Sequence, residues 1–451
     1  MRQATIFWGC TIPVRLPFVE KATRVLVSDL GWRLIEPVGF TCCPETQLVK
    51  TADELAFYAT AARNLVLAKE HAATLVTPCS GCYSTFRQTA SRLRVDRALR
   101  QTVSHLLRNT DLSPVTMPQI WHLAEWLCDE IGPDVLRRQV VRPLAGMRLA
   151  VHYGCHLLRP TPAVGWDSAL EPSKLERLLQ ALGATVVDYP SKMDCCGSGL
   201  ERAEGRGASR QLLDRKLADV LEAQADALVV ACPACFLQFD LGQAAGAPGA
   251  SAQATFPVFY LAELVALALG HSAVELGAEL HRIPVAGFLD KWEQNLEHRA
   301  ELARYFDLHQ LEICASCGAC DADCPAAVAV SDFAPSQIVH GLLAGELKKI
   351  IAGPEPWHCL ECMTCFERCH SRLGMAWIFE TLKKLAREQG HFPSSLRAGY
   401  QSFLSTGVLG TPRTSLREKL GLPSLAPQGS AELRTVLDKV LSSQTCDEVQ
   451  Q

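Results

Sequence analysis

The stretch "LVTPCSGCYSTF", residues 75–86, joins a short apolar run to two cysteines that are separated by two residues. The apolar run predicts a buried strand, and the residues after Cys82 predict a helix. The same pattern returns in "LVVACPACFLQF", residues 228–239. Strands and helices alternate around both stretches, so the sequence predicts two α/β domains, each a small sheet with flanking helices.

Each of these turns ends a set of five cysteines. The sets have the patterns C-x31-C-C-x35-C-x2-C and C-x39-C-C-x35-C-x2-C, and the lead-in "IFWGC" (6–10) matches "VHYGC" (151–155). An identical spacing between doublet and turn in two weakly similar copies indicates duplication of one domain. The ten cysteines are Cys10, Cys42, Cys43, Cys79, Cys82, Cys155, Cys195, Cys196, Cys232 and Cys235.

Composition narrows the class of protein. Of the 451 residues, 48% are hydrophobic and 20% are charged, and the net charge of -4 is unlike the basic excess of nucleic-acid binders. The N-terminus has no secretory signal pattern, and the longest apolar stretch, 256–270, is too short for a membrane span. We therefore expect a cytoplasmic protein with no membrane span and no nucleic-acid partner. In that compartment, 20 cysteines indicate metal or redox chemistry rather than structural disulfides.

A second cysteine pattern follows the duplicated part. The stretches "CASCGACDADCPA" (314–326) and "CLECMTCFERCH" (359–370) both contain C-x2-C-x2-C-x3-C, the run used by two-cluster bacterial ferredoxins. In such runs the fourth cysteine binds the other cluster, and His370 here stands where proline is common. Two zinc sites are the alternative, although zinc motifs rarely add the third step. The expected cubane [4Fe-4S] ligands are Cys314, Cys317, Cys320 and Cys369 for one cluster, and Cys359, Cys362, Cys365 and Cys324 for the other.

The five-cysteine sets do not suit a cubane, which takes four thiolates. Adjacent cysteines are also poorly placed to chelate one tetrahedral metal, because successive side chains diverge. They suit two different irons of one cluster. The count and the doublet therefore favour a non-cubane cluster that needs five thiolates. The alternatives are a cubane with one spare cysteine in each copy, or disulfide or zinc use.

The duplicated arrangement resembles the cysteine-rich CCG domains of the catalytic B subunit of heterodisulfide reductase. The segments "CCPE" (42–45), "CHLLRP" (155–160) and "CCGSGL" (195–200) strengthen the likeness, and the later runs resemble the C subunit of the same enzyme. The resemblance covers roughly residues 3–270 and 300–385. It implies a non-cubane [4Fe-4S] cluster on each five-cysteine set, with a disulfide cleaved between the two. It also implies a flavin-containing A-type partner subunit as the electron donor.

These patterns predict an oxidoreductase that reduces a disulfide, or oxidises two thiols, by one-electron steps at two non-cubane clusters fed by two cubanes. A small-molecule disulfide or thiol is the expected substrate. No flavin or nicotinamide site is expected in this chain, because "GSGLERAEG" (197–205) lacks the context of a dinucleotide fingerprint. The alternative is an electron-relay subunit without a disulfide substrate. A positively lined cavity open to solvent favours catalysis, and a closed or covered gap favours relay.

Three residues near Cys155 are candidates for substrate or proton contacts, namely His152, His156 and Arg159. Packing and hydrogen bonding around the cluster is the alternative role for all three. Cys128 fits the apolar face of a helix and is expected to be a core thiol, and Cys446 is expected to bind no metal.

The expected domains are residues 1–145 and 146–275 for the two duplicated copies, with a mainly helical ferredoxin-like domain over 276–395. Residues 396–451 are expected to form a partly flexible tail.

Overall fold

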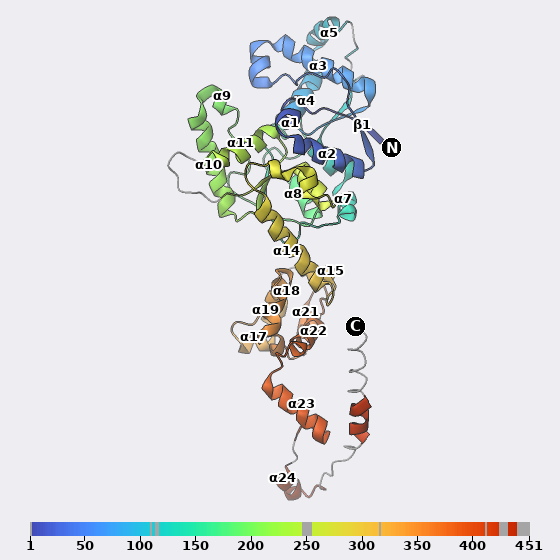
Figure 1. Cartoon of the computed structure of the whole chain (residues 1–451), viewed down its shortest axis with the longest axis vertical. Helices are drawn as coiled ribbons and strands as arrows, with labels where there is room; N and C mark the ends of the chain where they lie inside the picture. The colour runs from blue at the N-terminus through green and yellow to red at the C-terminus, as the bar shows by residue number, and fades with distance from the viewer. Residues whose placement is uncertain are drawn as a thin grey trace. The chain divides into compact units, whose positions relative to one another are not determined.

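The structure is a computed structural model. It describes residues 2–108, 111–112, 117–245, 255–314, 317–410, 413–423 and 432–439. The chain divides into two compact units, Met1–His298 and Arg299–Gln451. Figure 1 shows strands in the first unit and helices in the described part of the second.

The first unit contains two four-stranded parallel sheets with the same strand order, β2-β1-β3-β4 and β6-β5-β7-β8. This confirms the α/β class predicted for both copies. The strands are β1 Arg2–Ile6, β2 Trp32–Ile35, β3 Thr74–Thr77, β4 Gln119–His122, β5 Arg148–His152, β6 Thr185–Val187, β7 Ala227–Val230 and β8 Val258–Tyr260.

The register is also equivalent in the two sheets. In the first, Thr5 pairs with Ile35 on one side and Leu75 on the other. In the second, Ala150, the counterpart of Thr5, pairs with Val187 and with Leu228, the counterpart of Leu75. Helices flank the sheets, so the central strands are buried apolar runs, as parallel sheets require.

Helices connect consecutive strands in both copies, although the first copy has two helices where the second has one, as between β1 and β2 and between β5 and β6. The helices that begin within the first unit are α1 Thr11–Arg15, α2 Pro17–Asp29, α3 Glu54–His71, α4 Ser80–Val95, α5 Arg97–Leu106, α6 Leu123–Glu125, α7 Pro133–Gln139, α8 Lys174–Ala181, α9 Leu200–Glu204, α10 Arg206–Glu222, α11 Pro233–Ala244, α12 Leu261–Ala268, α13 Ala273–Leu276 and α14 Ala286–Leu302. Single π or 3-10 turns are η1 Thr46–Lys50, η2 Trp126–Ile131 and η3 Ala278–Leu280.

The strand order creates a switch point in each sheet. The chain leaves β1 toward one side of the sheet and β3 toward the other, and β5 and β7 repeat this divergence. In open α/β sheets the crevice at such a point, outside the carboxyl ends of the strands, is where ligands bind.

The two sheets belong to one hydrophobic core. The ring centroids of Phe18 on α2 and Phe236 on α11 lie 5.3 Å apart, and α2 packs along α12. The buried residues of both copies form one continuous cluster. The copies are therefore packed as one body, which fixes the carboxyl edges of their sheets relative to each other.

The second unit is helical, which confirms the class predicted for this part of the chain. Its core includes Val339, Leu342, Phe379 and Leu382, and cysteines of both C-x2-C-x2-C-x3-C runs pack against it. Its helices are α15 Leu308–Glu312, α16 Ala319–Ala322, α17 Pro325–Ala329, α18 Pro335–Leu343, α19 Leu347–Ala352, α20 Glu355–His358, α21 Thr364–Arg368, α22 Met375–Glu388, α23 Ser394–Thr406 and α24 Thr414–Lys419.

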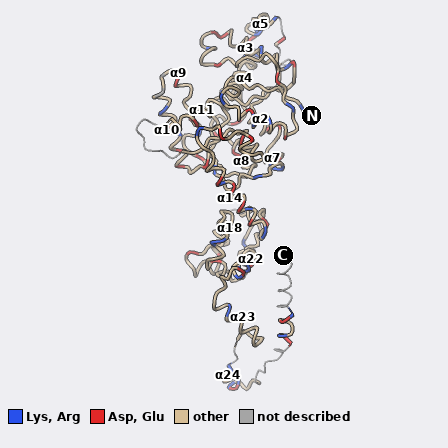
Figure 2. Tube along the Cα trace, in the orientation of Figure 1, with Lys and Arg blue, Asp and Glu red and all other residues tan. Residues whose placement is uncertain are grey.

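Charges of both signs are interspersed along the chain in both units (Figure 2). Within the described ranges, no helix is both long enough and apolar enough to cross a bilayer. The boundaries at 145, 275 and 395 and the flexibility of the tail stay predictions. Cys446 lies outside the described residues.

Candidate functional site

All ten cysteines of the duplicated copies line one cavity of about 400 Å³. Cys10 and Cys155 follow the strands β1 and β5, and the C-x-x-C turns follow β3 and β7. Because the carboxyl ends of parallel strands meet at one edge of a sheet, these thiols converge at the switch points. The structure thus brings together every residue of the two five-cysteine sets.

Helix N-termini lie directly at the C-x-x-C turns. Cys79 is the N-cap residue of α4, and its Sγ accepts a hydrogen bond from the backbone N–H of Cys82 at 3.5 Å. Cys232 holds the same position on α11. The positive end of a helix dipole favours a thiolate over a thiol. The helix dipole therefore favours ionisation at both turns, and the contacts among the thiols add effects of their own.

The doublet of the first copy divides between two environments. Cys43 is buried, with its Sγ 2.9 Å from Cys82 Sγ, whereas Cys42 is exposed. Hydrogen bonding to Cys43, burial and the neighbouring Cys10 raise the pKa of Cys42. Each cysteine of the doublet thus has a further thiol neighbour of its own, Cys82 on the buried side and Cys10 on the exposed side.

The second copy repeats this division. Cys196 is buried, with its Sγ 3.4 Å from Cys235 Sγ, and Cys195 is exposed. Hydrogen bonding from Cys155, then from Cys196, lowers the pKa of Cys195. The two doublets therefore have equivalent thiol neighbours. That the members of a doublet bind different irons stays a prediction.

The two sets meet at the first cysteines of their C-x-x-C turns. Hydrogen bonding with Cys232 is the main cause that raises the pKa of Cys79 well above its ordinary value. The pKa of Cys232 is correspondingly lowered, by Cys235 first and by Cys79 second. One cavity therefore holds two thiol sets that adjoin each other across the boundary between the copies.

Two hydrogen bonds cross between the copies directly behind these turns. His122 Nδ1 accepts from the N–H of Ala124, so its Nε2 carries the proton and donates to the carbonyl oxygen of Ala231 at 3.0 Å. Burial lowers the pKa of His122 to about 4, which keeps the ring neutral. The hydroxyl of Tyr260 donates to the carbonyl oxygen of Pro78. Each copy therefore holds the residue that precedes the turn of the other copy.

This reciprocal pair of residues was not predicted from the sequence. The signal was present in "HLAE" (122–125) and "YLAE" (260–263), which end the last strand of each sheet and place His122 and Tyr260 at equivalent positions. Ser80 adds a third contact, because its Oγ donates to Ala231 O at 2.9 Å.

Loss of the Tyr260 hydroxyl should destabilise the first unit. Tyr260→Phe leaves the ring in place but removes the donor to a buried carbonyl oxygen, which costs about 1–3 kcal/mol. We expect a lower urea midpoint under anaerobic conditions. Tyr305→Phe is the control, because this tyrosine of the second unit is 43% exposed. Equal midpoints for the two variants would contradict a structural role for the crossing bond.

Gly9 allows the close approach of Cys82. A Cβ at Gly9 would lie 2.9 Å from Cys82 Sγ, and the residue has a φ of +71°. Gly31 has a similar φ of +75° but nothing within 4 Å of the same added atom. Gly9→Ala and Gly31→Ala therefore carry similar backbone strain, and only the first displaces a thiol. We expect a lower iron content for Gly9→Ala alone, measured after anaerobic reconstitution; equal iron in both variants would argue against Cys82 as a ligand.

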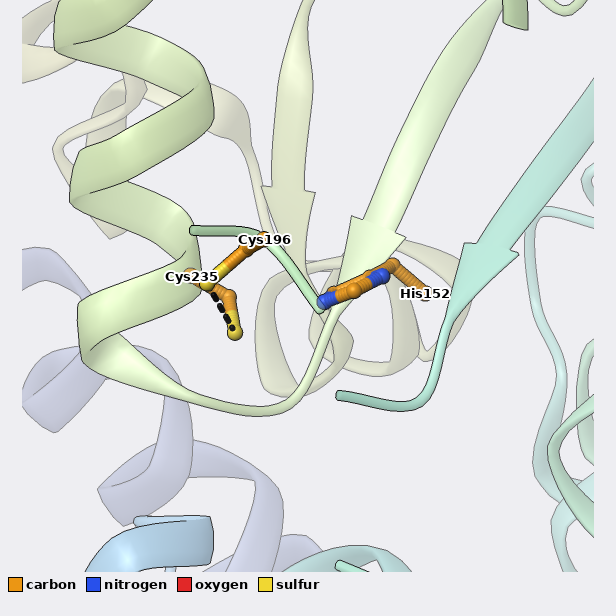
Figure 3. A group of neighbouring side chains, drawn as sticks. All are labelled: His152, Cys196 and Cys235. Carbon is orange, nitrogen blue, oxygen red and sulfur yellow. Dashed lines mark hydrogen bonds between the residues drawn. The ribbon is translucent and has the colours of Figure 1, made fainter. Parts of the chain in front are cut away.

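The three non-cysteine candidates have different surroundings. His156 lines the cavity. His152 is buried, and its ligand atoms lie within 4.8 Å of Cys196 and Cys235 Sγ (Figure 3). Arg159 is not among the described lining residues, because its guanidinium donates to the carbonyl oxygens of Ala169 at 3.2 Å and Met193 at 3.5 Å. The structure therefore gives Arg159 a role in holding loops.

The cavity reaches the surface, since Cys10, Cys42 and Cys195 are exposed. Its charge differs from the positive lining that would indicate an anionic substrate. Among the described lining residues, Glu45 is the one acid and there is no lysine or arginine. The Glu45 carboxylate accepts a hydrogen bond from the N–H of Leu48 at the start of η1.

The second unit brings four cysteines of the two later runs around one apolar cavity. Cys324, from the first run, lines it together with Cys359, Cys362 and Cys365 from the second. This is the set predicted for one cubane. Burial raises the pKa of Cys359 and of Cys365, and a bound cation such as iron would favour their ionised forms.

The other predicted set is exposed to a similar degree. Cys314, Cys320 and Cys369 pack against the helical core, and Cys317 is exposed. Outside both groups, Cys128 is buried on η2, with its Sγ 3.6 Å from the carbonyl oxygen of Lys174. It does not line either cysteine cavity.

Comparison with known families matches both parts of the chain. A family described as a cysteine-rich domain, CCG, matches residues 4–87 and again 149–240. A family described as a 4Fe-4S dicluster domain matches residues 313–373. The duplicated matches span strands β1 to β3 and β5 to β7, and the third match contains the two later cysteine runs.

Individual proteins resemble the first unit. The B subunit of the ferredoxin:CoB-CoM heterodisulfide reductase of Methanosarcina mazei is 33% identical over 292 residues, which cover 64% of this chain and 97% of that protein. The 8-methylmenaquinol:fumarate reductase membrane anchor subunit of Wolinella succinogenes is 30% identical over 277 residues, 61% of this chain and 95% of that protein. A crystal structure of a hypothetical protein from Helicobacter pylori shares the fold, with a TM-score of 0.51 and 14% identity over 62% of this chain and 52% of that chain.

Proposed function

Because the chain belongs to the family of heterodisulfide reductase B subunits, we propose that it reduces a disulfide, or oxidises two thiols, within an oxidoreductase complex. The observation that carries this proposal is the single cavity lined by both five-cysteine sets. One disulfide takes two electrons and two protons and gives two thiols. Two adjoining, equivalent metal sites on one cavity match its two sulfur atoms.

The residues present fit iron–sulfur clusters. Within the described part of the chain all cysteines are free thiols, and ten of them converge on one cavity without an opposing positive side chain. We assign a non-cubane [4Fe-4S] cluster to each set of five and a cubane to each set of four in the second unit. When bound, such clusters supply one-electron transfers.

The cavity wall favours a substrate with little negative charge near its sulfurs. Glu45 would repel a carboxylate or sulfonate at that position, and no described lining residue is a lysine or arginine that would attract one. His156 is our candidate for delivering protons to the product thiolates, because it lines the cavity beside Cys155.

Electrons would enter from another polypeptide through the cubanes. We propose a flavin-containing A-type subunit or another donor subunit as this partner. The relatives are named as subunits of larger reductases, which supports assembly with partner chains.

The direct test is a disulfide assay on protein purified anaerobically with its copurifying partners. We expect reduced viologen to be oxidised when an uncharged disulfide is added. Bis(2-hydroxyethyl) disulfide should react faster than its carboxylated counterpart, dithiodiglycolate. Failure of every disulfide in a panel, with clusters retained, would argue against catalysis at the cavity.

That outcome would favour electron relay, the second candidate. The similarity to a fumarate reductase subunit supports it, since the name of that protein includes a quinol and fumarate but no disulfide. For a relay, partner-driven electron transfer should persist when the cavity is alkylated after cluster loading. Catalysis predicts that the same treatment stops turnover.

A further inference from the structure

The two halves of the cavity differ at one buried position. In the first copy the segment "IFWGC" places Phe7 three residues before Cys10, and in the second "VHYGC" places His152 three residues before Cys155. Phe7 directly follows the last residue of β1, and His152 is the last residue of β5. An apolar ring in one copy is therefore replaced by an imidazole in the other.

His152 has no structural partner that explains its polarity. It is 1% exposed, and neither ring nitrogen has a hydrogen-bond partner among the described residues. One face is covered by Phe239, whose ring centroid lies 4.9 Å away at an interplanar angle of 83°. A buried imidazole without a partner is costly, which indicates that a group absent from the polypeptide accepts its proton.

The thiols of the second set indicate where the acceptor of the His152 proton would lie. Figure 3 shows His152 at the end of β5, facing Cys235 on α11 and Cys196 on its loop. A Cβ added at Gly154 would lie 3.8 Å from His152 Nε2 and 3.5 Å from Cys235 Sγ, so imidazole and thiol border the same point. The ring therefore lies at the edge of the proposed second cluster site.

Phe7 has ordinary core contacts instead. Its ring packs edge-on against Phe40 at 5.1 Å and against Phe86 at 4.7 Å. It offers no donor to Cys82, the first-copy counterpart of Cys235. The cysteines of the two copies are equivalent, but their surroundings at this position are not.

A buried cation adds to the difference. Lys216 on α10 is 1% exposed and donates to the carbonyl oxygens of Ser191 and Lys192, just before the second doublet. Arg63 on α3 makes the equivalent contact, to Gly39 O at 2.8 Å, but it is exposed. A positive charge in a low-dielectric interior acts more strongly on a nearby anionic group than one in water.

We propose that His152 donates a hydrogen bond to a sulfur atom of the second cluster, and that this hydrogen bond raises the reduction potential of the second cluster above that of the first. The proposal rests on the proposed function, because it requires a cluster on the second five-cysteine set. Hydrogen bonds to cluster sulfurs stabilise the reduced, more negative state. The two sites of the cavity would then be unequal, with the second reduced first.

The test is a redox titration of the reconstituted full chain, followed by EPR. His152→Phe should lower the equilibrium constant for reduction of one cavity cluster by about tenfold. The reduction potential of that cluster then falls by about 59 mV for one electron. His152→Gln keeps a donor and should restore part of the shift. Phe7→His should raise the potential of the other cluster. The two cubanes serve as internal references, because they lie in the second unit.

Each outcome decides between the two proposals. Absence of non-cubane clusters in the unmodified chain would overturn the proposed function. Clusters present with unchanged potentials in His152→Phe would overturn only the role of His152. If His152→Phe fails to load, an unshifted potential in Phe7→His would still reject the role of His152. A strongly coupled ¹⁴N in electron–nuclear double resonance would show direct iron ligation and contradict the hydrogen bond.

Discussion

Cys43→Ser should remove the non-cubane cluster of the first copy and abolish disulfide turnover, while both cubanes of the second unit stay loaded. Cys43 is the buried member of its doublet, with its Sγ 2.9 Å from Cys82 Sγ. Serine preserves the shape of the side chain but lacks the soft sulfur that iron prefers. Iron content and Mössbauer spectra of the anaerobically reconstituted variant should show the loss of one cluster's iron.

The turnover loss follows from the shared cavity. If each of two sites receives one sulfur of the substrate, one remaining site cannot complete a two-electron cleavage. Cys196→Ser, in the equivalent position of the second copy, should have the same effect on turnover but remove the other cluster. A double variant should be no less active than either single variant, since each already prevents the reaction.

Cys128→Ser is the matched control. It replaces another buried thiol of the same unit that lies outside both cysteine cavities. It should retain all clusters and turnover. If Cys43→Ser lost the cubanes as well, the doublet would act on the folding of the whole chain and would not belong to one local site.

The predictions that the structure and the comparisons confirmed rested on short sequence patterns. A strand, a C-x-x-C turn and a helix form within a dozen residues, so "LVTPCSGCYSTF" alone predicts the α/β unit around Cys79. Repetition then gave the second domain. That cysteines at strand ends lie along one edge of each sheet also followed from geometry, because parallel strands place their carboxyl ends at the same edge.

Features that depend on packing between distant segments could not be predicted in this way. The hydrogen bonds of His122 and Tyr260 join residues more than a hundred positions apart. Arg159 follows the cysteine motif in sequence, but its guanidinium is used by backbone carbonyls of distant loops. The charge of the cavity wall is set by loops from both copies, and Glu45 became visible as its one acid among the described residues only in the fold.

The duplication explains both the likeness and the difference between the two sites. The cysteines that we assign to the two clusters have equivalent positions in both copies, and each doublet has one buried and one exposed member. Residues that only surround the site have diverged, as Phe7 and His152 show. A mixed disulfide has two different sulfur atoms. Two unequal cluster sites would therefore also give such a substrate a preferred orientation in the cavity.

Cys324→Ser should remove the same cubane as Cys362→Ser, although the two residues come from different runs. Cys324 lines the apolar cavity that contains Cys359, Cys362 and Cys365. If each fourth cysteine ligates the cluster of the other run, both variants lose one and the same EPR signal. Cys317→Ser should remove the other signal. Partner-driven turnover should fall to background in all three, because the path from the donor subunit is interrupted.

The crossed pairing also separates iron–sulfur clusters from two zinc sites. Two zinc ions held each by its own run would make Cys324→Ser resemble Cys317→Ser, and neither would change an EPR signal. Reduced viologen that reaches the cavity directly should still drive disulfide reduction in Cys324→Ser, since the ten cysteines of the first unit are unchanged. If Cys324→Ser lost viologen-driven turnover as well as partner-driven turnover, the result would contradict the proposal that the cubanes only transfer electrons to a separate catalytic cavity.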